Sequence, residues 1–105
     1  MGECNIRVLP GVCKLDTTIK ATVTDDWKVV FQVESDCPSV MKLAEALGEM
    51  DPMKNLDTKI GETEVYLKAN DTIAHTACPV PCAMIKAIEV ASDMGLKRDV
   101  VIEIR

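Results

Sequence analysis

Hydrophobic and polar side chains alternate along three segments in the first third of the chain, as in strands with one buried and one solvated face. The segments are residues 4–9, 18–24 and 29–33. Their apolar sides are formed by Cys4, Ile6 and Val8, by Ile19, Ala21 and Val23, and by Val29, Phe31 and Val33. Pro10-Gly11 and Asp25-Asp26 separate the segments and are typical of turns. The pattern predicts an antiparallel meander of three strands.

Two later segments have helical periodicity instead. The first begins at Pro38, because proline suits the first position of a helix, and it ends near Gly48. Its apolar stripe is Val40, Leu43, Ala44 and Leu47. The second runs from Pro81 to Met94 and ends at Gly95. Its predicted buried stripe is Met84, Ile85, Ile88 and Ala91.

The remaining segments are less regular. Residues 49–61 are polar and are predicted to be a loop with one helical turn. Residues 62–77 favour a helix through apolar positions four apart, although Asn70-Asp71 weakens the pattern. Val100, Ile102 and Ile104 alternate with Val101 and Glu103 and predict a final strand. The fold class expected is α+β: a single domain, residues 1–105, with a mainly antiparallel three- to four-stranded sheet and helices packed on one face.

Composition narrows the classes of function. The formal net charge is −5, with acidic and basic residues interleaved, so no basic block favours nucleic acid binding. No apolar run is long enough to span a membrane, and the N-terminal residues lack the regions of a signal peptide. We therefore expect a cytoplasmic protein. The five cysteines are an odd number, and in a reducing cytosol they point to metal binding or catalysis more than to disulfides.

The cysteines differ in their predicted surroundings. Cys13 follows the first turn, and Cys37 and Cys78 each precede a helix. The partial positive charge at a helix N-terminus stabilises a thiolate, so the pKa of Cys37 and Cys78 is expected to be lowered. Cys4, on the inner side of a strand, is expected to act as a small buried hydrophobe. Cys82 lies four residues after Cys78 and shares a helix face with it or packs in the core.

Cys13, Cys37 and Cys78 come from separate parts of the chain, at the ends of elements that folding could bring together. His75, the only histidine, lies three residues before Cys78. No Cys-x-x-Cys pair is present, which disfavours a zinc finger. The candidate ligands are therefore Cys13, Cys37, Cys78 and His75, with Cys82 as a further metal ligand.

Several segments resemble a family of small uncharacterised proteins of anaerobic archaea and bacteria. They are Pro10-Gly11-Val12-Cys13, Ser35-Asp36-Cys37, His75-Thr76-Ala77-Cys78-Pro79-Val80-Pro81 and Lys86-Ala87-Ile88-Glu89-Val90-Ala91. The order of strands, helices and cysteines also resembles the iron–sulfur cluster assembly scaffolds of the IscU/NifU type. That resemblance implies that Cys13, Cys37, His75 and Cys78 hold a nascent cluster at one end of the sheet. The scaffolds have adjacent His and Cys residues, whereas His75 and Cys78 are separated here.

The leading interpretation is a non-enzymatic protein that binds a metal ion or an iron–sulfur cluster, because thiolates select clusters, zinc or copper(I) over hard cations. A protein partner in cluster or sulfur transfer is expected with it. One alternative is a thiol oxidoreductase or sulfur carrier in which Cys78 attacks and Cys82 or Cys37 resolves. Another is a structural or regulatory module with inert thiols, dimeric through the segment around Met50 and Met53. Monomer and homodimer both stay open, and no glycine-rich phosphate loop indicates transferase chemistry.

Overall fold

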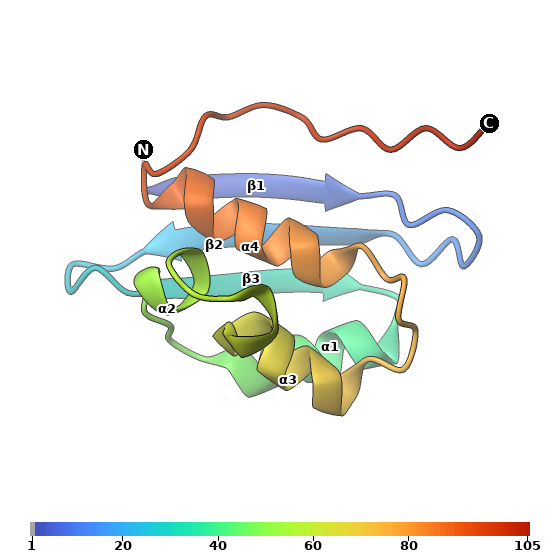
Figure 1. Ribbon diagram of the computed structural model, residues 1–105, viewed down its shortest axis with the longest axis horizontal. Coiled ribbons are helices and arrows are strands. Elements are labelled where there is room, and N and C mark those ends of the chain that lie inside the picture. The colour runs from blue at the N-terminus through green and yellow to red at the C-terminus, as the bar shows by residue number, and fades with distance from the viewer. Residues whose placement is uncertain (1) are drawn as a thin grey trace.

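A three-stranded antiparallel sheet forms one layer of the computed structural model, which describes residues 2–105 (Figure 1). Its strands are β1 (Glu3–Val8), β2 (Thr17–Val23) and β3 (Val29–Ser35), in the order β1-β2-β3. Ile6 pairs with Ile19, and Ile19 pairs with Val33. This register places the apolar positions of all three strands on one face, because side chains alternate between faces with a period of two.

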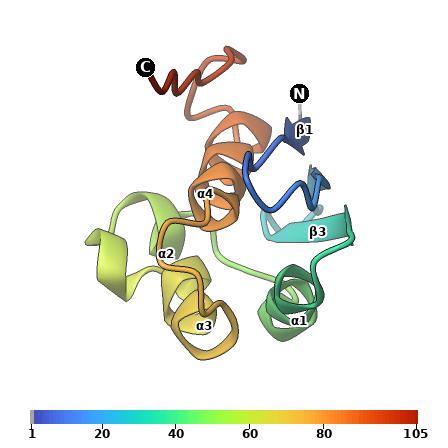
Figure 2. The same ribbon diagram turned by 90° about the vertical axis from the view of Figure 1, so that its right-hand side faces the viewer.

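The helices cover that apolar face and leave the other face open (Figure 2). They are α1 (Pro38–Leu47), α2 (Met53–Leu56), the 3₁₀ helix η1 (Ile60–Glu62), α3 (Glu64–Thr72) and α4 (Val80–Ala91). The α+β class and the antiparallel meander predicted from the sequence are confirmed. The predicted start of α1 at Pro38 is also confirmed, and Gly48 follows the helix with a positive φ of 54°.

The core lies between the sheet and two helices. Helix α4 packs on β1 and β2, and α1 packs on β3. Met84, Ala87 and Ile88 of α4 have no exposed surface, and neither has Leu43 of α1. Full burial of a Leu, Ile or Met side chain stabilises the fold by about 1.5–3 kcal/mol through the hydrophobic effect. These side chains therefore fix how α4 lies across the sheet.

The segment after α1 is tied to both the sheet and α3. Met50 exchanges two backbone hydrogen bonds with Val29, of 2.8 and 2.9 Å, and its side chain is only 1% exposed. Asn55 in α2 is buried, donates to Glu64 Oε1 at 3.1 Å and accepts from the Val65 N–H at 3.0 Å. Because Met50 belongs to the core, this part of the segment does not offer the dimer surface that one alternative requires.

Two ambiguous predictions have clear outcomes. Residues 64–72 are helical, including Asn70 and Asp71, and the Thr63 side chain caps this helix by accepting from the Tyr66 N–H. The final strand predicted at Val100–Ile104 is wrong, because residues 96–105 have no regular secondary structure. Val100, Ile102 and Ile104 are 61–91% exposed. Alternation alone cannot make a strand, since a strand needs a neighbour for its backbone hydrogen bonds.

Candidate functional site: the thiol end of the sheet

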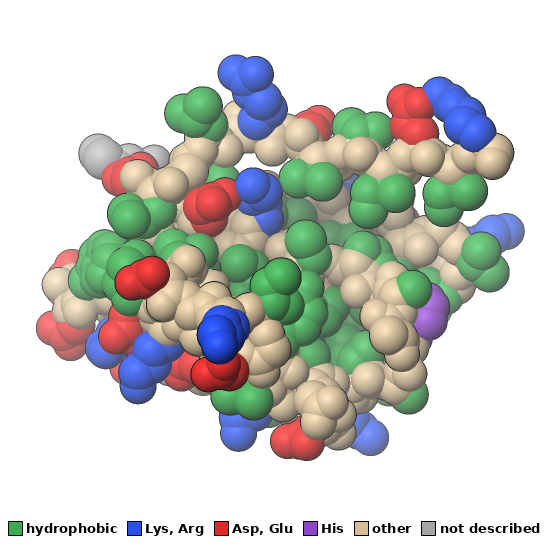
Figure 3. Space-filling model, in the orientation of Figure 1, with side chains coloured by type: hydrophobic (Ala, Val, Ile, Leu, Met, Phe, Trp, Pro, Cys, Tyr) green, Lys and Arg blue, Asp and Glu red, His purple; other side chains and the backbone are tan. Residues whose placement is uncertain are grey.

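Three segments that carry cysteines lie at one end of the sheet, on the right in Figure 1. They are the connection from β1 to β2 with Cys13, the junction of β3 and α1 with Cys37, and the connection from α3 to α4 with Cys78. The purple side chain of the only histidine is on the same side in Figure 3. We call this region the thiol end.

Cys13 lies in a tight turn at the surface. The Lys14 N–H donates to the Gly11 carbonyl at 3.0 Å and closes the turn. Gly11 has a φ of 88°, which glycine adopts without steric cost. Lys14 has a φ of 57°, where a side chain is disfavoured. The turn leaves Cys13 exposed to solvent.

Cys37 is the N-cap residue of α1 and is half-buried. Its N–H donates to Ser35 Oγ at 3.1 Å, and Ser35 Oγ is 2.7 Å from Thr17 Oγ1. Its carbonyl accepts from the Met41 N–H at 3.1 Å, the first bond of the helix. These contacts join β2, β3 and α1, so the position of Cys37 is set by a hydrogen-bonded junction.

Cys78 and His75 are the two ends of a turn. The Cys78 N–H donates to the His75 carbonyl at 3.0 Å, a bond typical of a β-turn. His75 is exposed, whereas Cys78 is half-buried and packs against the core. Pro79 then caps α4, so Cys78 lies outside the helix as the sequence predicts. The turn brings the histidine backbone close to the cysteine although two residues separate them.

The pKa of Cys78 is raised, contrary to the prediction from its place before a helix. Burial is the largest cause, because it disfavours the charged thiolate. A hydrogen bond from the Val80 N–H lowers the pKa, but it does not outweigh burial. The charges of Cys37 and Cys13 raise the pKa further, so both thiols lie near enough to act on Cys78. Cys78 is therefore a protonated thiol near neutral pH.

Tyr66 is a neighbour of the thiols that sequence reasoning missed. It lies in the first turn of α3, and its pKa is raised by burial and then by the charges of Cys82 and Cys78. Cys82 itself is exposed in the first turn of α4. No signal in the sequence links Tyr66 to these cysteines, because their proximity depends on how α3 packs beside α4.

Cys4 lies elsewhere, on the inner face of β1, and is 5% exposed. Burial raises its pKa, as expected for a thiol that acts as a hydrophobe. No group of three His, Cys, Asp or Glu side chains within residues 2–105 is close enough to hold a metal ion. The thiol end thus gathers Cys13, Cys37 and Cys78 in one region without a closed coordination set.

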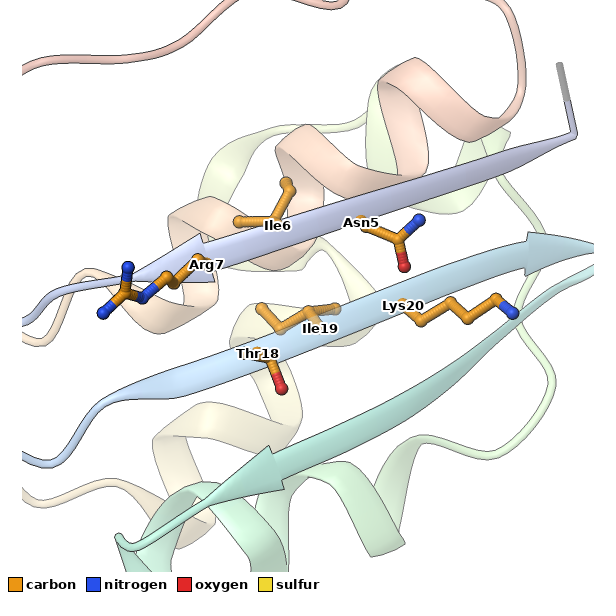
Figure 4. A pocket seen from close by; sticks show the side chains of 6 residues that line it. All are labelled: Asn5, Ile6, Arg7, Thr18, Ile19 and Lys20. Atoms are coloured by element: carbon orange, nitrogen blue, oxygen red, sulfur yellow. The ribbon is translucent and has the colours of Figure 1, made fainter.

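Two shallow depressions lie on the sheet, and neither is lined by a cysteine. The first has a volume of about 300 Å³ and is formed by β1 and β2. Figure 4 shows the six residues that line it, among them Asn5, Arg7 and Lys20. The second, of about 460 Å³, is lined by residues that include the acidic Asp16 and Glu34.

Within the described residues, no helix has the length and apolar character needed to cross a membrane. The model of a protein family described as "Family of unknown function (DUF6951)" matches residues 4–104. The match spans nearly all of the sequence, and the chain therefore belongs to this family. No curated protein matches the chain, and no solved structure does either.

Proposed function

We propose that this member of the family binds a soft metal ion or an iron–sulfur cluster at the thiol end, with Cys13, Cys37 and Cys78 as thiolate ligands. The observation that carries the proposal is the meeting of three cysteines, from three separate segments, at one end of the sheet. All five cysteines of the chain are free thiols. Soft thiolates favour iron–sulfur clusters, zinc and copper(I) over hard cations.

The raised pKa of Cys78 supports metal binding over nucleophilic attack. A protonated thiol is a poor nucleophile, since the thiolate is the reactive form. A bound metal, in contrast, displaces the proton from a ligating thiol and lowers the cost of the charge. Burial that raises the pKa of Cys78 therefore slows thiol exchange but does not prevent ligation.

His75 and Cys82 are the candidates for the fourth ligand. His75 is exposed and shares a turn with Cys78. Cys82 is exposed one helical turn beyond Cys78 and close to Tyr66. We favour His75, because the direction of the Cys82 side chain is fixed by the helix, whereas His75 lies in a connection that can adjust. Three thiolates and one imidazole suit tetrahedral zinc or a two-iron cluster.

Closure of the site requires the three thiols to move closer together, because no three ligands are assembled within residues 2–105, and we expect the Cys13 turn to supply this movement. The turn that carries Cys13 is exposed, so its movement uncovers little apolar surface. A site that closes on its cargo suits a scaffold or carrier more than a structural zinc site, which holds the fold together. We place the activity in a reducing cytosol, with a protein partner that delivers or receives the cluster.

Anaerobic purification followed by visible absorption and metal analysis tests the proposal. We expect stoichiometric iron with sulfide, or stoichiometric zinc, in the unmodified protein. We expect the bound metal to be lost in each of three single variants, Cys13→Ser, Cys37→Ser and Cys78→Ser, because a hydroxyl does not ionise near neutral pH. Cys4→Ala is the matched control, since Cys4 is buried on another part of the sheet.

If the unmodified protein holds no metal after reconstitution under reducing conditions, the proposal is wrong. The alternative of a thiol oxidoreductase or sulfur carrier then takes its place. It requires a mixed disulfide or persulfide on Cys78, which mass spectrometry of the intact protein would detect.

A further inference from the structure

The C-terminal segment, residues 99–105, carries several apolar side chains that the fold leaves uncovered. Val100 and Val101 are 61% and 73% exposed, and Ile102 and Ile104 are 76% and 91% exposed. Green apolar side chains project from this segment along the upper side of the molecule in Figure 3. The family match continues to residue 104, so the segment lies within the part of the chain that the family model covers.

The segment has the pattern of a half-buried strand. Val100, Ile102 and Ile104 would lie on one side of such a strand, and Val101, Glu103 and Arg105 on the other. The sheet has the same polarity, with an apolar face under the helices and an open face on which Asn5, Arg7 and Lys20 lie (Figure 4). A strand of this pattern fits an edge of this sheet with its apolar side toward the helix layer.

β1 provides a free edge. It pairs only with β2, and the Gly2 carbonyl accepts from the Val23 N–H at 2.8 Å. In an antiparallel ladder, every second residue directs both its N–H and its carbonyl to the same neighbour. Since Gly2 faces β2, the backbone groups of Glu3, Asn5 and Arg7 face away from the sheet. This edge has its hydrogen-bonding groups open for another strand.

The segment of the same chain is poorly placed to fill this edge. It leaves α4 at the end of the sheet where β1 begins and runs in the direction of β1 (Figure 1). Figure 2 shows that it does not lie in the plane of the sheet. As a strand beside β1, the segment would be parallel to β3. The chain between β3 and the segment forms the helices, which lie on the side of the sheet that faces the viewer of Figure 1. A crossover from β3 to the segment on that side would be left-handed, whereas about 98% of crossovers between parallel strands are right-handed.

We propose that the C-terminal segment of one copy adds as a fourth strand to the β1 edge of a second copy, and that the exchange is reciprocal. A two-fold arrangement satisfies both open edges and both apolar segments at once, as in other isologous dimers. Strand addition supplies backbone hydrogen bonds, and the side chains of Val100, Ile102 and Ile104 are then covered. The handedness constraint does not apply, because no connection within one chain joins the added strand to the sheet.

The test is the mass of the protein in solution, measured by light scattering after size exclusion at tens of micromolar. We expect twice the 11.5 kDa mass of the chain for the unmodified protein. Asn5→Pro should yield a monomer, because it removes an edge N–H without touching the ladder between β1 and β2. Asn5→Ala retains that N–H and should stay dimeric. A chain ending at Arg98 should be monomeric with an unchanged helical circular dichroism spectrum.

A second pair of variants tests which face of the C-terminal segment is buried in the dimer. Ile102→Asp should dissociate the dimer, because it places a charge on the side that meets the helix layer. Val101→Thr, on the open side, should not. Backbone amides of residues 99–105 should exchange slowly in the dimer and at least tenfold faster in the Asn5→Pro monomer.

Three outcomes would overturn the proposal. The first is a monomeric unmodified protein. The second is a dimer that survives both Asn5→Pro and removal of the segment. The third is an Asn5→Pro monomer in which the backbone amides of residues 99–105 are protected from exchange. The last outcome would mean that the segment pairs within its own chain.

Discussion

The two helices that follow a Cys-Pro pair begin in different ways. At α1, Cys37 is itself the N-cap, with an extended backbone (φ −89°, ψ 116°), and Pro38 is the first helical residue. At α4, Pro79 is the N-cap with a helical backbone (φ −79°, ψ −7°), and Cys78 lies one residue further out. The same dipeptide thus places its sulfur at two different distances along the chain from the first helical turn.

The surroundings differ as well. Ser35 holds the backbone of Cys37 in a polar junction between two strands and a helix. Both thiols are half-buried and pack against the core, and at Cys78 burial outweighs the hydrogen bond from the Val80 N–H. Cys78 teaches that a position before a helix does not by itself lower the pKa of a thiol. At Cys78 burial decides the direction, because the loss of water around the thiolate is more unfavourable than one backbone hydrogen bond is favourable.

The largest expected effect is a difference in metal content between variants of Cys78 and Cys82, the two cysteines near the start of α4. Cys78→Ser should abolish bound iron or zinc in anaerobically prepared protein, whereas Cys82→Ser should leave most of it in place. Cys78 lies outside the helix, where its sulfur can approach a shared ligand. The measurement is the metal-to-protein ratio of both variants, prepared side by side. Equal loss in the two would make Cys82 a ligand in place of His75.

A second prediction concerns the reactivity of Cys78 without metal. Since its pKa is raised, alkylation at neutral pH should be several-fold slower than for the same cysteine in the urea-unfolded chain. The rate should also increase at a higher pH than for a free thiol, whose pKa is about 8.5. Peptide mass spectrometry after timed alkylation measures both. A native rate equal to the unfolded rate at every pH would contradict the raised pKa.

The entry to α1 depends on a hydrogen bond that α4 lacks. Ser35→Ala should destabilise the protein by about 1 kcal/mol, because the Cys37 N–H loses its partner and Thr17 Oγ1 keeps only its bond to the Leu15 carbonyl. Urea unfolding followed by circular dichroism gives this difference. Ser39→Ala, in the first turn of the same helix, is the control and should change stability by less than about 0.5 kcal/mol.

The smallest expected effect is the dependence of stability on alkaline pH. A raised pKa means that the native state binds the thiol proton more tightly than the unfolded state. The contribution of Cys78 to stability is therefore complete below the pKa of the unfolded thiol and is lost as pH rises through the native pKa. Urea unfolding at several pH values above 8 measures this decline. It should be less steep in Cys78→Ala, and an identical slope would rule out Cys78 as a source.

The meander and α1 could be predicted because their patterns are local. Residues 4–9 and 29–33 alternate in polarity, and Pro38 and Gly48 mark the limits of α1. α3 was harder, since Asn70 and Asp71 disfavour a helix and only the cap at Thr63 and packing on α1 overcome this. The final strand failed for the opposite reason. Val100–Ile104 has a strong strand pattern, but a place beside β1 in the same chain would need a left-handed crossover, and residues 96–105 have no regular secondary structure.

The sequence by itself determined which residues alternate, where the helices begin and that Cys13, Cys37 and Cys78 lie at the ends of elements. These properties depend on neighbours within a few positions, which propensity and turn chemistry control. Only the tertiary structure decided that Cys78 is half-buried, that Tyr66 lies near it and that Asn55 bridges α2 and α3. Burial and contacts between helices result from the packing of segments that are distant in the sequence. The residues next to a side chain in the sequence therefore do not determine how much of it is exposed to solvent.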